Sequence, residues 1–160
     1  MAIAPEQTSD TTLTPEQLQK LDLISDTILY AEAVAFIRRL VREEELDPLP
    51  NSQILGLLNV AEGSNYSDMY QFVKHQRDRN WSGSKQGIKT FYTDLEKYLM
   101  EMSRRRMREE FQLVTPELPK NAAKAEVDAL MTALTHDFIL HFAAENGVLL
   151  AEAADRRKTK

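Results

Sequence analysis

The stretch "TPEQLQKLDLISDTILYAEAVAFIRRLV", residues 14–41, favours a helical fold. It begins with Thr14 as a candidate N-cap, Pro15 at the first helical position and Gln17 where a capping box requires it. Apolar residues then recur at helical spacing, first as Leu18, Leu21, Ile24 and Ile28 and later as Val34, Ile37 and Val41. The two series differ in phase near Tyr30, so the helix changes its buried face there or bends.

Four more helical segments are expected after the prolines at 48 and 50. A second helix covers about 52–63, with Asn51 or Ser52 as its cap. A third opens at Ser64 or Ser67 and ends at the loop 80–87, a fourth runs from Ile88 to Leu113, and a fifth ends near residues 146–147. No segment shows the alternation of apolar and polar residues that is typical of a β-strand. We therefore predict an all-α, single-domain bundle of about five helices over 14–150, with a mobile tail at 1–13 and a frayed tail at 151–160.

The composition restricts the possible classes of protein. The chain has 160 residues, of which 42% are hydrophobic, and no cysteine. It can therefore form a core, but it has no disulfide framework, thiolate nucleophile or cysteine-based metal site. No apolar run reaches the roughly 20 residues that span a bilayer, and the N-terminus does not resemble a signal peptide. We expect a cytoplasmic protein.

The charge is distributed unevenly along the chain. The formal net charge is −5, yet residues 71–108 hold ten lysines and arginines against four acidic residues. Such asymmetry within one domain indicates a basic surface that meets a polyanion or an acidic partner.

Four arginines within residues 103–108 are the densest part of this basic segment. Arg104 and Arg108 continue a solvent-facing line from Lys97, and Glu101 can pair with Arg104 and Arg105. Arg106 instead falls where a core residue is due, so we expect the helix to leave its core after Met102 and to reach outward to phosphates or carboxylates. The alternative is a solvent-exposed helix face on which the arginines form ion pairs with neighbouring acidic residues and bind nothing else.

The loop 80–87 adds further candidates. Lys85 and Lys89 flank a helix N-terminus, where an anion is favoured, although a flexible connector has the same composition. Trp81 could stack on an unpaired base or anchor the loop to the core. The predicted nucleic-acid-binding residues are Lys74, Arg77, Arg79, Trp81, Lys85, Lys89, Lys97, Arg104, Arg105, Arg106 and Arg108. Met107 and Phe111 are predicted as an exposed contact with a neighbouring copy.

The sequence carries no catalytic signature that we can identify. His136 and His141 are five residues apart and cannot chelate jointly on one helix, whereas Asp137, His141 and Glu145 share a line that is more typical of surface pairs than of a metal site. The stretch "SGSKQG" lacks the leading glycine of a phosphate-binding loop. We expect no enzymatic activity, no metal and no cofactor; a helical hydrolase with Asp or Glu metal ligands is the least supported alternative.

The segment "LPNSQILGLLNVA", residues 49–61, resembles a segment of the small subunits of type III CRISPR effector complexes. The residues that carry the resemblance are Ser52, Gln53, Ile54, Leu57 and Leu58. The family commonly has threonine before the Ser-Gln pair and arginine after the isoleucine, where this chain has Asn51 and Leu55. Small subunits of type I complexes are similar in build.

The resemblance implies a non-catalytic subunit that stacks in several copies along a guide–target duplex and contacts the target backbone. Its partners would be the guide RNA and target nucleic acid, the large and backbone subunits, and further copies of itself, with no membrane. A helical adaptor whose basic helix docks on an acidic protein is the alternative function.

Overall fold

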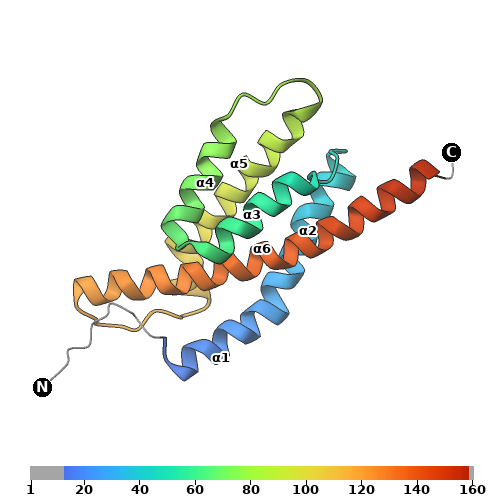
Figure 1. Cartoon of the computed structure of the whole chain (residues 1–160). Coiled ribbons are helices and arrows are strands. Elements are labelled where there is room, and N and C mark those ends of the chain that lie inside the picture. The colour runs from blue at the N-terminus through green and yellow to red at the C-terminus, as the bar shows by residue number, and fades with distance from the viewer. Residues whose placement is uncertain (1–12, 159–160) are drawn as a thin grey trace, which may run out of the picture.

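The computed structural model describes residues 13–158, and within this range the chain is helical with no strand. Five helices form the bundle, as predicted (Figure 1). The first combines α1 (Pro15–Ile24), α2 (Tyr30–Arg38) and π-helical turns after each of them. It is followed by α3 (Asn51–Gly63), α4 (Tyr66–Asp78), α5 (Gln86–Glu101) with a π-helical continuation at Met102–Glu110, and α6 (Lys120–Lys158).

The predicted start of the first helix is confirmed. Gln17 donates its backbone N–H to the Thr14 hydroxyl at 3.1 Å, and the Gln17 side chain accepts from the Thr14 N–H at 2.9 Å. The predicted slip near Tyr30 is a π-helical turn at Ser25–Leu29. One extra residue in a helical turn rotates all following side chains, and Leu29, Ala33 and Ile37 thereby become the buried positions.

The caps of α3 and α4 differ from those expected. Pro50 precedes α3, and Asn51 already belongs to the helix, so neither Asn51 nor Ser52 caps it. Asn65 caps α4, because its side-chain oxygen accepts from the Asp68 N–H at 2.9 Å.

The predicted end of the last helix is wrong. α6 continues through Lys158, past Asn146 and Gly147, so residues 151–158 are helical. Asn146 lies inside the helix, and its fully buried side chain accepts from the Leu49 N–H at 2.9 Å and donates to the Leu49 carbonyl at 3.0 Å. The predicted N-terminal tail lies, except for Leu13, outside the described residues, as do the last two residues.

The core consists of two clusters, and α6 contributes to both because it crosses the whole bundle (Figure 1). Phe138, Ile139 and Phe142 join the larger cluster, with α2, α3, α4 and α5. Leu130, Met131 and Leu134 join the smaller cluster, where α1 and the segment around Met107 pack. None of the described helices combines the length and apolar character that a membrane span requires.

Candidate nucleic-acid interface

A group of basic residues lies at the end of the α4–α5 hairpin, where Arg79, Lys85 and Lys89 are exposed and Lys74 and Arg77 are partly exposed. We call this group the hairpin end; it consists of Lys74, Arg77, Arg79, Lys85 and Lys89. Figure 1 shows the hairpin extending beyond the neighbouring helices, with the loop between α4 and α5 at its tip. The loop is brought back to the bundle by Leu46, which lies 3.1 Å from where a Cβ on Gly87 would be. A side chain at position 87 would therefore require the Leu46 side chain to shift by a few tenths of an ångström.

Contacts within the hairpin bring several of these cations together. The Lys89 ammonium donates to the Arg77 carbonyl at 2.8 Å, which ties the start of α5 to the end of α4. Arg77 holds the pKa of Asp78 below its ordinary value, and Lys89 and Lys74 act in the same direction. Asp78 therefore lies within the field of three cations, which it neutralises only in part.

Arg77 is the one member of the hairpin end that forms ion pairs with two carboxylates. Its Nε lies 2.9 Å from Asp78, and one terminal nitrogen bonds Glu96. Glu96 also accepts from the Tyr70 hydroxyl at 2.8 Å, and burial together with this hydrogen bond raises the pKa of Tyr70 to about 12. Arg77 thus serves mainly to hold α4 against α5, which reduces its availability to a ligand.

Trp81 does not present its indole to solvent, contrary to the base-stacking interpretation. Its side chain is buried, and the indole N–H donates to the Gln76 carbonyl at 2.6 Å. The Arg79 guanidinium lies over the indole, 4.7 Å from the ring centre, and donates to the Gln76 side chain at 3.1 Å. Trp81 is therefore the anchor of the loop, and Arg79 is held on its outer side as an exposed cation.

The arginine run does not form a free cationic strip. Arg106 is buried and donates to Glu32 at 2.8 Å and to Glu110 at 2.8 Å. Arg105 pairs with Glu101 at 2.6 Å. The physical reason is the π-helical segment Met102–Glu110, which turns Arg106 inward against α2, where Glu32 lies.

Arg104 and Arg108 remain as the exposed part of the run. Neither forms an ion pair within residues 13–158. They lie at the far end of the long helix from Lys89, about 20 Å or more along its axis at 1.5 Å per residue. Arg104 and Arg108 are therefore separated from the hairpin end and do not form one continuous surface with it.

Met107 and Phe111 are not an exposed subunit contact. Met107 is completely buried and belongs to the smaller core cluster, with Leu21, Leu113 and Leu130. Phe111 is half-buried against the same cluster, and the Arg106 guanidinium lies 5.1 Å from its ring centre. The apolar positions shift after Met102 because the helix meets a second core of its own chain there, formed with α1 and α6.

Lys97 lies in a shallow groove of mixed charge between α2 and α5. Asp94, Glu101 and Arg39 also line it, together with Phe36 and Tyr98. Arg39 donates to Asp94 at 2.8 Å and also pairs with Glu44. Because carboxylates alternate with cations here, this groove attracts a polyanion less than the hairpin end does.

The side chains of Asp137, His141 and Glu145 do not point toward a common position where a metal ion could be bound. His141 lies 2.8 Å from the Ser25 hydroxyl, and Glu145 accepts from Arg38 at 2.5 Å. Among residues 13–158, no group of three potential ligands could hold a metal ion.

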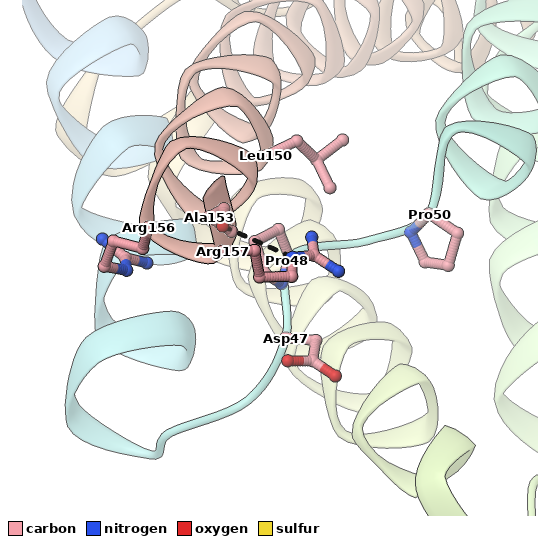
Figure 2. A pocket seen from close by; sticks show the side chains of 7 residues that line it. All are labelled: Asp47, Pro48, Pro50, Leu150, Ala153, Arg156 and Arg157. Atoms are coloured by element: carbon pink, nitrogen blue, oxygen red, sulfur yellow. Dashed lines mark hydrogen bonds between the residues drawn. The ribbon is translucent and has the colours of Figure 1, made fainter. Parts of the chain in front are cut away.

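A hollow of about 530 Å³ lies beside the end of α6, and the sequence did not point to it (Figure 2). Pro48 and Pro50 form one wall, and Leu150 and Ala153 form the other. Figure 2 shows Arg157 folded back onto its own helix, where its Nε donates to the Ala153 carbonyl at 3.4 Å. Asp47 brings a carboxylate to the same hollow, so its charge is mixed.

No protein-family model matches the chain, and no curated protein or solved structure is significantly similar to it.

Proposed function

We propose that this chain is a non-catalytic helical subunit of a CRISPR-type ribonucleoprotein and that it contacts a nucleic-acid backbone through the hairpin end. The observation that carries the proposal is the charge of that region, where Arg77, Lys89 and Lys74 act on Asp78 and only Arg77 pairs with Glu96. The resemblance of residues 49–61 to type III small subunits supports the choice of complex. Guide RNA, target strand and the larger subunits are the partners that this proposal implies.

The hairpin end suits phosphates better than bases. Lys74, Lys85 and Lys89 are flexible point charges, and Arg79 offers a guanidinium held in place by Trp81. Since the indole is buried, Trp81 is not presented for stacking on a base. Binding should therefore be independent of sequence and should weaken steeply as salt displaces the cations from the backbone.

Fluorescence anisotropy with labelled single-stranded RNA and DNA of mixed sequence tests this surface. The variant Lys74→Glu/Arg79→Glu/Lys85→Glu/Lys89→Glu should lose binding at 50 mM salt, because it reverses four charges without touching the Arg77 ion pairs. The controls are Arg104→Glu/Arg108→Glu and the variant Lys85→Glu/Lys89→Glu, which each reverse two charges and so compare the arginine run with the hairpin end at equal charge. Equal losses in the two variants, or no binding by the wild-type chain, would refute the assignment.

Membership of a ribonucleoprotein needs a separate experiment. The tagged chain should co-purify with guide RNA and larger proteins when it is expressed together with its neighbouring genes. Recovery of the chain alone, under salt conditions at which it binds RNA, would contradict the CRISPR assignment but not the backbone contact.

The adaptor function remains a second candidate because Arg104 and Arg108 are exposed beside the neutralised Arg105 and Arg106. Such a mixed surface fits an acidic protein partner through a few directed ion pairs. Competition with heparin separates the two functions, since an adaptor keeps its protein partner in an excess of polyanion and a backbone-binding subunit loses its nucleic acid.

A further inference from the structure

One wall of the hollow beside the end of α6 is held rigidly in place. Pro48 and Pro50 line it, and their rings fix the backbone angle φ at both positions. Leu49 lies between them with its side chain buried, and its N–H and carbonyl are both bonded to Asn146 of α6, at 2.9 and 3.0 Å. The wall is therefore fixed against α6 before any ligand arrives, which lowers the ordering cost of binding.

The opposite wall belongs to the last turns of α6, which extend beyond the end predicted from the sequence. Leu150, Ala153 and Arg157 are spaced by three and four residues, so they lie on the same face of the helix. Leu150 and Ala153 are half-buried and give this wall an apolar surface. The enclosed volume of about 530 Å³ lies within the range of about 300–1,000 Å³ that is typical of small-molecule sites.

Arg157 offers the hollow a guanidinium whose outer edge is available. Its Nε donates to the Ala153 carbonyl at 3.4 Å, and its terminal nitrogens form no ion pair or hydrogen bond within residues 13–158. Figure 2 shows this guanidinium between Pro48 and Pro50 in that view. The two terminal nitrogens of an arginine match two oxygens of a phosphate. Because Arg156 also lines the hollow and the single carboxylate is that of Asp47, the net charge favours an anion.

Asp47 requires a ligand that also carries hydrogen-bond donors. Its carboxylate is exposed and forms no ion pair within the described part of the chain. An unpaired nucleotide combines the three features that the hollow demands, because it has an anionic phosphate, a flat ring for apolar walls and N–H donors on the base edge. Guanine fits best, since its Watson–Crick edge has two adjacent N–H donors for the two oxygens of one carboxylate.

We propose that this hollow binds one unpaired nucleotide and that guanine is its preferred base. The phosphate lies on Arg157, and the base lies against Pro48 and Leu150 with its donors on Asp47. The nucleotide is either free in solution or part of a single strand, since both present the same groups. The hollow shares no residue with the hairpin end, so this site goes beyond the proposed backbone contact and does not depend on it.

Titration with guanosine monophosphate, followed by ¹H–¹⁵N NMR, tests the site. The amides of Asp47, Leu49 and Ala153 should shift and saturate. Guanosine, which lacks the phosphate, should bind about tenfold more weakly, and inosine monophosphate, which lacks the exocyclic amino group, about fivefold more weakly. No saturable shift up to about 10 mM guanosine monophosphate would overturn the proposal.

Two variants assign the roles of the charged groups. Arg157→Gln should reduce the affinity for guanosine monophosphate to that for guanosine, and Asp47→Asn should remove the preference over inosine monophosphate. The matched controls are Lys120→Gln, which removes an exposed positive charge at the opposite end of α6, and Asp26→Asn, which removes an exposed negative charge. Both controls should bind as the wild type does. Equal affinities of Arg157→Gln and Lys120→Gln would refute the phosphate contact.

Oligonucleotides distinguish the two sources of the nucleotide. An oligouridine strand that contains one guanosine should shift the same three amides more than pure oligouridine does if the site serves a strand. Shifts with guanosine monophosphate and none with either strand would show that the ligand is free. Failure of this proposal is distinguishable from failure of the backbone contact, because guanosine monophosphate is titrated with no strand present at the hairpin end.

Discussion

Arg106 and Glu32 form a bidentate ion pair across 74 positions of sequence, with both terminal nitrogens of the guanidinium 2.8 Å from the two carboxylate oxygens. The Tyr98 hydroxyl donates to the same carboxylate at 2.7 Å, and Glu110 bonds the other edge of Arg106. The hydrogen bond with Glu110 raises the pKa of Arg106 most, and the one with Glu32 adds to it despite the burial of the group. This network joins the first helix to α5 and to the π-helical segment that follows it.

Replacement of Glu32 should destabilise the fold. Glu32→Gln leaves the buried Arg106 with one carboxylate instead of two, and we expect a loss of about 1–3 kcal/mol in the free energy of unfolding. Urea denaturation measures it. The matched control is Glu101→Gln, which breaks the exposed pair with Arg105 and should cost less than about 1 kcal/mol. Equal costs in the two variants would show that the buried network contributes nothing beyond a surface ion pair.

Glu126 should make the stability depend on pH in the acidic range. Its carboxylate is buried, which opposes ionisation, but it accepts from the Thr115 N–H at 2.8 Å, the Thr115 hydroxyl at 2.6 Å and the Gln17 side chain at 2.7 Å. These bonds outweigh burial and hold the pKa of Glu126 below its ordinary value of 4.5. A lowered pKa in the folded state stabilises the fold above pH 4.5, and this contribution is lost as the pH falls further through the folded-state pKa.

The variant Glu126→Gln isolates this contribution. It should unfold about 1–3 kcal/mol more easily than the wild type at pH 7, because an amide cannot accept all three bonds. The difference should shrink as the pH falls below 4.5. Urea titrations at several pH values between 3 and 7 measure it, and a difference that stays constant over that range would contradict the assignment.

Asn146 should be the most sensitive polar residue of α6. Asn146→Ala removes both hydrogen bonds to the Leu49 backbone and leaves a buried N–H and a buried carbonyl without partners, at a cost of about 2–3 kcal/mol. Thermal unfolding followed by circular dichroism checks this. Asn59→Ala on the exposed side of α3 is the control and should change stability by less than about 0.5 kcal/mol. A melting temperature of Asn146→Ala equal to that of the control would show that the two hydrogen bonds to Leu49 do not stabilise the fold.

Trp81 should affect stability and not nucleic-acid affinity. Trp81→Ala should lower the free energy of unfolding by about 3–5 kcal/mol, since a buried indole is lost, and Trp81→Phe by less. Binding of RNA by the folded fraction of Trp81→Phe should equal that of the wild type. The opposite outcome, unchanged stability with an affinity loss of about 1–3 kcal/mol, would indicate that the indole stacks on a base after all.

Local patterns were sufficient to predict the elements of the fold. The capping box at Thr14 and Gln17 depends on residues three positions apart, and the phase slip near Tyr30 is visible in the spacing of apolar residues. The end of α6 was mispredicted because Asn146 and Gly147 have the composition of a C-cap, whereas the partner that Asn146 actually uses, Leu49, lies 97 positions away.

The sequence predicted which basic residues belong to the candidate site, but not which of them are exposed and which are paired with carboxylates. The basic segment, and the unusual position of Arg106 in the apolar stripe, follow from the sequence alone. Neither Glu32 nor Glu96 gives any local sign that it will neutralise an arginine. The tertiary ion pairs were therefore needed to distinguish the exposed cations of the hairpin end from the neutralised arginines.

The sequence by itself determined that this chain is helical, that its first helix contains a slip and that positive charge is concentrated in its middle. These properties arise from interactions between residues a few positions apart, which any helical chain of this sequence would make. Only the tertiary structure decided which cations remain exposed and which are paired inside the fold. Packing brings together residues that are distant in sequence, and a guanidinium that meets a carboxylate inside the fold is no longer available to a partner.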